Sequence, residues 1–413
     1  MNLEATLIVV AAILILLPRA LARLRIPLGI TAFFIGLGAR EFAPEVAGND
    51  FIKLFSVLGI SSLFLLAGME INFSDLKKHR APLIQHILIQ LVAIIISACS
   101  IYLLFEFSIS QCTLISLALW TPSTGFIMDS VSQWKVSQDE TFWIKTKAIA
   151  AEIAALFLMF VVTQSESSLS PGVSFALMGA FIIALPIVFH FLARLILPFS
   201  KGSEFSLLVL LALACAVFTK EIGAYYLIGA FFVGLVSNQT MRRLPQVSNK
   251  QILDALNLFA GFFIPFYFFN SGTLMFGASW SLKSLWHGLA VVGIVLPVRV
   301  GITMLHRALV SGEKISSSFR IGVAMSPNLI FGLVIAGIIF RSGAEADWIL
   351  PALIIYTFVS SLLPVIVLGK SSKRYHLVKS FSLFFGAKPA KLVAPKLKDE
   401  GVKPEADAGQ QNT

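Results

Sequence analysis

The chain has 413 residues, of which 57% are hydrophobic and 13% are charged, and its mean hydropathy is +0.86. In soluble domains about a quarter of the residues are charged, so this composition excludes an ordinary soluble protein and indicates many apolar segments in a lipid bilayer. The net charge of +10 lies in short loops and a tail, as cytoplasmic loops require, and does not indicate nucleic-acid binding.

Apolar runs long enough to cross a bilayer recur along the chain, since a membrane-spanning helix needs about 20 such residues. They predict an all-α, polytopic membrane protein with about 13 transmembrane helices in one domain, residues 1–369. The runs 26–42 and 222–238 are short, but glycines and a polar break before each neighbour favour two separate spans. The predicted spans are 4–22, 26–42, 52–69, 82–105, 111–131, 141–164, 172–197, 203–219, 222–238, 252–270, 284–306, 316–340 and 346–368.

The basic residues predict the orientation of these spans. With the N-terminus outside, 17 of the 32 Lys and Arg residues fall in cytoplasmic loops and span ends, Lys147 among them, whereas 5 fall outside. This distribution follows the positive-inside rule and predicts a multi-pass protein of the inner or cell membrane with a cytoplasmic C-terminus. The basic tail, 370–413, is predicted to be disordered. Its first part either lies on the anionic inner leaflet or only supplies topology-setting charge.

Two predicted spans contain a polar break around a proline. The fifth span contains WTPSTG at 120–125 and the twelfth contains SPN at 326–328. Each break predicts an interrupted helix at membrane depth, with a simple proline kink as the alternative. Because the two spans are seven apart, spans four to six and eleven to thirteen are predicted to form an inverted repeat with two crossed broken helices, which in transporters marks a binding site. The predicted broken-helix residues are Pro122, Gly125, Ser326, Pro327 and Asn328.

Glu152 is the one acidic residue near the middle of a predicted span. It lies 11 residues from one end of span six and 12 from the other, which is roughly 17 Å from either surface. An ionised side chain at that depth costs on the order of 3 kcal/mol. Glu152 is therefore predicted to bind an ion or a proton, with a structural carboxyl as the alternative. Ala148, Ala151 and Ala155 share its face, so another backbone can approach closely.

Arg299 is the one basic residue well inside a predicted span, seven residues from the cytoplasmic end of span eleven. It either extends to the interface or provides a fixed positive charge near the site. Half-helices place positive N-terminal ends and negative C-terminal ends at the crossing. Glu152 and Arg299 have the signs that would compensate them.

Four further stretches follow one another in a characteristic order: IPLGITAFFIGLGA (26–39), LFLLAGMEINFSDLKKH (63–79), IGAYYLIGAFFVGLVSN (222–238) and IPFYFFNSGTLMF (264–276). Together with the breaks and Glu152, they resemble the monovalent cation/proton antiporter superfamily, and within it the sodium/proton exchanger and Kef-type potassium/proton antiporter branch. The resemblance covers about residues 5 to 368.

The resemblance implies roles for particular residues. The ion-binding acid of the sixth span matches Glu152, and the basic residue of the eleventh span matches Arg299. Three departures accompany the match: Glu152 stands where relatives carry Asp, Ala151 where they carry a polar residue, and Asn328 where many carry an Arg-Gly-Glu cluster. The resemblance also implies a homodimer in which a core of spans four to six and eleven to thirteen moves against a dimerisation scaffold.

The sequence thus predicts a Na⁺ or K⁺/proton antiporter in which Glu152 binds either a proton or the cation. Oxygen atoms of Thr121, Ser123 and Thr124 are predicted to complete the cation shell, because hard cations prefer oxygen ligands. With one site carboxylate, one-for-one electroneutral exchange is expected. No cofactor is expected, and the expected partners are the cation, the proton, the lipid bilayer and a second copy.

Two other classes of function remain open. A sodium-coupled symporter of organic anions would use Arg299 to hold the substrate carboxylate, and Ala151 and Asn328 also fit a non-transporting or regulatory relative. An enzyme is not expected, because no Ser/His/Asp set occurs and the six histidines show no metal-ligand spacing.

Overall fold

The computed structural model describes residues 3–22, 26–71, 73–164, 170–195, 199, 203–243, 249–275, 280–341 and 348–369. The chain divides into two compact units, residues 1–369 and 370–413. All described residues belong to the first unit, so the predicted tail lies outside them.

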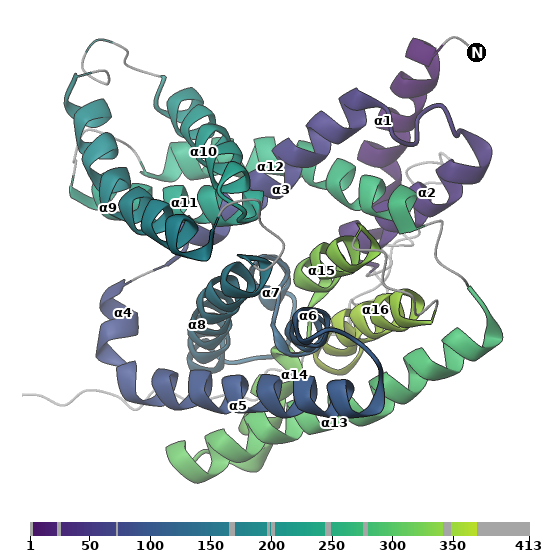
Figure 1. Ribbon diagram of the computed structural model, residues 1–413. Coiled ribbons are helices and arrows are strands. Elements are labelled where there is room, and N and C mark those ends of the chain that lie inside the picture. Colours follow the sequence, from purple (N-terminus) through teal and green to yellow (C-terminus); the bar gives the residue numbers. More distant parts are fainter. Residues whose placement is uncertain are drawn as a thin grey trace, which may run out of the picture. The chain divides into compact units, whose positions relative to one another are not determined.

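The described part of the chain folds into sixteen helices, and its only β contact is an isolated bridge between Trp134 and Gly369 (Figure 1). The helices are α1 (Leu3–Ala22), α2 (Leu28–Phe42), α3 (Asp50–Met69), α4 (Phe73–Lys78), α5 (Arg80–Leu104), α6 (Ile109–Trp120), α7 (Thr124–Val131), α8 (Gln138–Thr163), α9 (Pro171–Leu195), α10 (Glu204–Glu221), α11 (Tyr226–Arg243), α12 (Asn249–Met275), α13 (Leu282–Ser311), α14 (Ile315–Ala324), α15 (Leu329–Arg341) and α16 (Ile349–Leu368).

Each of the thirteen predicted spans coincides with one helix or with a pair of helices separated by a short break. The short helix α4 is the one described helix that the apolar runs do not predict. By length and composition, eight described helices can cross a bilayer, or nine if α14 and α15, bent by 41°, form one span. The all-helical, polytopic class is therefore confirmed, whereas thirteen crossings stay a prediction.

The breaks at the two prolines follow from local chemistry. Proline has no N–H and restricts the residue before it to extended backbone. Thr121, which precedes Pro122, accordingly ends α6 in an extended conformation (φ −84°, ψ 124°). Ser123 is also extended before α7 begins. In the second break, α14 ends at Ala324 and α15 begins only after Asn328.

The helices form two groups by their contacts (Figure 1). The core group consists of α5 to α8 and α13 to α16, so that a long helix, a broken helix and a long helix occur twice, in the order predicted for the repeat. The scaffold group consists of α1 to α3 and α9 to α12, with α3 and α12 packed tightly together. The main contacts between the groups join α3 to α7 and α12 to α15.

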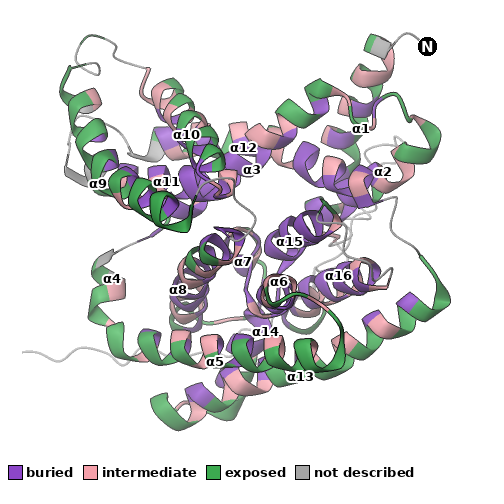
Figure 2. Cartoon of the chain, viewed as in Figure 1, coloured by how far each residue is buried: buried purple, intermediate pink, exposed green. Residues whose placement is uncertain are grey.

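Burial differs sharply among the helices of both groups (Figure 2). Helix α15 is buried along almost its whole length, which holds the second break inside the protein. In contrast, α5, α9 and α13 expose large apolar side chains such as Leu103, Ile183 and Leu309. Such faces would be unfavourable in water and suit the lipid of a bilayer.

Glycines bring the scaffold helices into backbone contact. A Cβ atom added at any of six glycines would lie 2.0–2.4 Å from a carbonyl oxygen of a neighbouring helix, closer than any real side chain approaches. These glycines are Gly36, Gly59, Gly68, Gly229, Gly234 and Gly272. Small residues at such crossings let membrane helices pack closely.

Replacing Gly272 with Ala should destabilise the scaffold, because its Cβ would lie 2.1 Å from the Phe33 carbonyl oxygen. We expect a loss of about 1–3 kcal/mol, as for other overpacked interiors, measured as a lower melting temperature in detergent. Gly261 lies in the same helix, and a Cβ there meets no atom within 4 Å. Gly261→Ala should therefore retain the wild-type melting temperature or raise it; an equal response of both variants would contradict this packing argument.

Candidate functional site

The two broken helices meet directly at their unwound segments. The backbone N–H of Ser123 donates to the carbonyl oxygen of Pro327 at 2.7 Å. In return, the N–H of Ile330 donates to the Ser123 hydroxyl at 2.8 Å, which caps the start of α15. Ser123 thus joins both breaks, and its hydroxyl already has a partner.

The side chain of Asn328 fixes the second break to two other helices. Its amide donates to the carbonyl oxygen of Ala118 in the last turn of α6 at 2.5 Å. Its amide oxygen accepts from the Ser360 hydroxyl of α16 at 2.5 Å, and the Ser326 hydroxyl donates to the Ser360 carbonyl at 2.9 Å. Ser326, Asn328 and Ser360 are all fully buried, so these contacts replace water for the unwound backbone.

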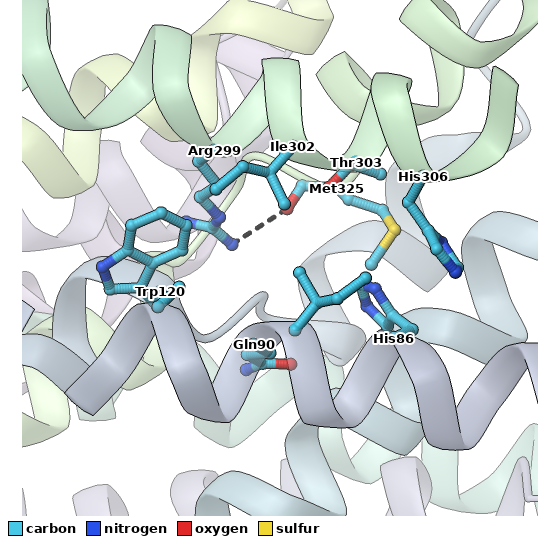
Figure 3. Close-up of a pocket in the computed structure, with 10 residues that line it drawn as sticks. His86, Gln90, Trp120, Arg299, Ile302, Thr303, His306 and Met325 are labelled. Carbon is cyan, nitrogen blue, oxygen red and sulfur yellow. Dashed lines mark hydrogen bonds between the residues drawn. The ribbon is translucent and has the colours of Figure 1, made fainter. Parts of the chain in front are cut away.

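Arg299 binds the C-terminal ends of both half-helices. Its guanidinium donates to Leu119 O at the end of α6 at 3.0 Å and to Met325 O at the end of α14 at 2.9 Å (Figure 3). The Tyr356 hydroxyl also donates to Leu119 O, at 2.8 Å. Helix C-terminal ends carry partial negative charge and unpaired carbonyls. Arg299 is 5% exposed, so its positive charge lies at these ends and does not extend to the surface.

Glu152 lies in α8 with its side chain fully enclosed. It is 1% exposed, and Ala148, Ala151 and Ala155 beside it are buried as well. Within the described residues neither carboxyl oxygen has a hydrogen-bond partner. The hydroxyl and backbone N–H of Thr124 lie beside the carboxyl group and interact with it electrostatically, without forming a well-aligned hydrogen bond. Because Thr124 begins α7, the carboxyl group lies near the positive end of that half-helix.

Two more oxygen atoms near the first break lack partners. The hydroxyls of Thr121 and Thr124 are buried and make no hydrogen bond within the described part of the chain. Buried polar groups are nearly always paired, so each exception asks for an explanation. Together with Glu152, these hydroxyls form a set of unpaired oxygen atoms, the ligand type that a hard cation prefers.

The structure thus unites some predicted site residues and separates others. Pro122, Thr121, Thr124, Ser326, Pro327 and Asn328 are buried around the crossing, and Gly125 packs against side chains of Leu63 and Ile330 at 3.2–3.3 Å from its added Cβ position. Glu152 and Arg299 are not an ion pair: among the described residues, the hydrogen bonds of Arg299 go to carbonyl oxygens and to Tyr356. Glu152 lies near the N-terminal end of α7, whereas Arg299 lies at the C-terminal ends of α6 and α14.

Sequence reasoning missed several residues of this region. Tyr356 and Ser360 are neutral and lie within an unbroken apolar run, so no local signal marks them. Lys147 is counted among the basic residues of cytoplasmic loops and span ends, but its side chain is fully buried inside α8, where no lone basic residue was expected. Its position six residues inside the predicted span 141–164 was the available signal.

Comparisons with known proteins agree with this architecture. The transmembrane sodium/hydrogen exchanger family model matches residues 8–370. The Na⁺/H⁺ antiporter NhaS5 of Synechocystis is 22% identical over 63% of this chain and 38% of its own length. The putative Na⁺/H⁺ antiporter YjbQ of Bacillus subtilis is 24% identical over 65% of this chain and 47% of its own length. The chain therefore spans less than half the length of both curated relatives.

A solved structure shows the same fold. The sodium proton antiporter MjNhaP1 of Methanocaldococcus jannaschii superimposes with a TM-score of 0.66 at 13% identity, covering 88% of this chain and 95% of that protein. At this identity the match establishes the fold alone. Because the family model matches nearly all of the first unit, this multi-pass membrane protein belongs to the sodium/hydrogen exchanger family.

Proposed function

We propose that the protein exchanges a monovalent cation, Na⁺ or K⁺, for a proton across the membrane. The observation that carries this proposal is the buried Glu152 carboxyl group, which has no hydrogen-bond partner among the described residues. It lies by the start of α7 near Thr124, whose hydroxyl is also unpaired. The names of the curated relatives, both described as Na⁺/H⁺ antiporters, point to the same activity.

Competition for one carboxylate would couple the two fluxes. A proton neutralises Glu152 covalently, whereas a dehydrated cation is held by the ionised carboxylate with oxygen atoms of Thr121 and Thr124. Ser123 would add its backbone carbonyl, which accepts from Ile127 N–H at 3.0 Å and has a second lone pair, whereas its hydroxyl binds Ile330. Only one ligand occupies the carboxylate at a time, so each passage of the site carries either a cation or a proton. One carboxylate per site gives electroneutral, one-for-one exchange.

Alternating access would come from motion of the core group against the scaffold group. The core group is joined internally by Ser123, Asn328 and Arg299, whereas its main contacts with the scaffold involve α3 with α7 and α12 with α15. A rigid core and a separate scaffold are the arrangement that rocking transporters use. We place the N-terminus outside and the C-terminus in the cytoplasm, and we propose a homodimer formed through the scaffold.

The experiment is a transport assay in proteoliposomes whose interior is more acidic than the outside solution and is monitored with a pH-sensitive dye. Adding Na⁺ or K⁺ in a series with Li⁺ and Rb⁺ should dissipate the gradient for at least one cation, and choline should have no effect. A flat response to all four cations across pH 6 to 9, a range that brackets neutrality, would contradict antiport and favour the non-transporting class.

An organic-anion symporter receives less support from the geometry. Arg299 would have to hold the substrate carboxylate, but its guanidinium already binds Leu119 and Met325. Binding a substrate there would take the guanidinium away from two buried helix ends, of which the end of α6 would keep only the Tyr356 hydroxyl.

A further inference from the structure

A second site lies apart from Glu152 and is lined by residues of α5 and α13. Between α5 and α13, beside the ends of α6 and α14, is a cavity of about 30 Å³. Its polar wall comes from His86 and Gln90 of α5 and from Arg299, Thr303 and His306 of α13, and the rest is mainly apolar (Figure 3). Since a water needs about 10–15 Å³ of such space, the cavity holds one or two water-sized species.

Unpaired polar atoms line this cavity from α5. Nε2 of His86 and both polar atoms of the Gln90 side chain have no hydrogen-bond partner within the described residues. Each side chain is only 7% exposed, and both line the cavity together with Arg299, Thr303 and His306 of α13. The Gln90 amide N–H is a donor, and so is Nε2 of His86 in the tautomer that protonates it. Buried donors left unpaired are costly, so these two groups suit a bound species that accepts hydrogen bonds.

The surroundings of the cavity are positively charged. Four ionisable groups interact electrostatically with His86, and all of them are basic: Lys147, His306, Arg299 and Arg307. Arg307 forms an ion pair with Glu313. Arg299 faces the negative ends of two half-helices, each equivalent to roughly half a charge. Both of these arginines are therefore compensated.

Lys147 is not compensated by any acidic side chain among the described residues. Its side chain is fully buried, and its Nζ lies 2.9 Å from Nδ1 of His306. An ammonium only donates, so Nδ1 accepts and His306 is neutral with its proton on Nε2. Nε2 in turn lies 3.5 Å from Oε1 of Gln85. One buried positive charge remains, and a buried charge needs a partner.

We propose that this cavity binds one small monovalent anion of halide size, which for the cell means chloride, and that the anion balances the charge of Lys147. Nε2–H of His86 and the Gln90 amide N–H donate to it. The apolar remainder of the wall suits a halide, because a halide is more weakly hydrated than a carboxylate or a phosphate. A halide is also small enough for a cavity of about 30 Å³, whereas a carboxylate or a phosphate is larger.

The anion site is separate from the cation site. Lys147 and Glu152 are five residues apart in α8, which places them roughly 140° apart around the helix. Glu152 faces Thr124 of α7, whereas Lys147 faces His306 of α13. The anion is thus a bound structural ion of the core group and not a competitor of the transported cation.

The test is ligand-dependent thermal stability of the full chain in detergent. With Na⁺ held constant, replacing gluconate by chloride should raise the melting temperature in a saturable manner, because a ligand of the folded state stabilises it. Constant Na⁺ separates this effect from cation binding at Glu152. Crystals soaked in bromide should show anomalous density in the cavity beside His86 and Gln90.

Two variants carry the test further. Lys147→Met should lose the chloride-dependent rise, and Gln90→Leu should raise the half-saturating chloride concentration about tenfold or more, as expected for loss of a hydrogen bond to a charged group. The exposed Lys283 provides the control, since Lys283→Met should respond like wild type. A chloride response of wild-type size in both Lys147→Met and Gln90→Leu, or only water in the bromide-soaked cavity, would overturn the proposal.

Discussion

Replacing Glu152 with Gln should abolish cation-dependent proton movement, lowering the rate by about 100-fold or more, the equivalent of about 3 kcal/mol. Gln keeps the shape of the side chain and can pair with the Thr124 hydroxyl, but it neither ionises nor takes up a proton near neutral pH. The fold should therefore survive while both half-reactions are lost. The measurement is cation-induced dissipation of a pH gradient in proteoliposomes, with the melting temperature of the same variant as a check on folding.

Two further variants sharpen this prediction. Glu152→Asp restores a carboxylate at shorter reach and should recover part of the flux, with a higher half-saturating cation concentration. Asp254 is an exposed acid of α12, and Asp254→Asn should transport like wild type. If Glu152→Gln exchanged cations for protons at the wild-type rate, the carboxylate would not be the coupling site.

The sequence was sufficient to predict the two helix breaks and the buried carboxyl group of Glu152, because their chemistry is local. Pro122 and Pro327 interrupt their helices wherever these are placed, and a carboxyl group in the middle of an apolar run is costly in any fold. The thirteen predicted segments coincide with helices for the same reason, since twenty apolar residues in lipid must satisfy their own backbone.

The partners of these residues depend on contacts between distant segments. Arg299 binds carbonyl oxygens of Leu119 and Met325, which lie 180 and 26 residues away. Carbonyl groups occur in every residue, so no sequence pattern marks the two that face Arg299. Tyr356 completes the network from a further helix. The sequence therefore singles out Arg299 as a buried charge but cannot supply its contacts, and its role in the site stays a prediction.

Lys147 was missed for a different physical reason. A basic residue near a predicted span end is normally drawn to the interface, and the positive-inside rule counts it there. In the structure α8 begins at Gln138, so Lys147 lies about two and a half turns inside the helix. Its neighbour His306 comes from a span that the sequence treats separately, and only packing brings the two together.

Replacing Arg299 with Met should lower the melting temperature strongly and abolish transport. The change removes the guanidinium from Met325 O and leaves Leu119 O with the Tyr356 hydroxyl as its remaining side-chain donor, and a buried group left unpaired costs about 1–3 kcal/mol. We expect a total loss of about 3 kcal/mol or more, since the negative ends of α6 and α14 would also face each other without a cation between them. The measurement is thermal unfolding in detergent, followed by the proteoliposome assay.

Arg299→Met should lose both stability and transport, whereas Glu152→Gln should lose transport alone. Graded variants at the Arg299 contacts test this difference. Tyr356→Phe keeps the guanidinium and removes one donor to Leu119 O, so it should cost about 1 kcal/mol. Arg299→Lys keeps the charge but lacks the planar guanidinium that reaches the ends of both α6 and α14. Its loss of stability should therefore lie between those of Tyr356→Phe and Arg299→Met. The exposed Arg40 is the control, and Arg40→Met should be neutral. If Arg299→Met melted like wild type while transport failed, Arg299 would act on the ion and not on the half-helices. A parallel loss of stability and transport means that the fixed charge holds the crossing together so that Glu152 can exchange its ligands.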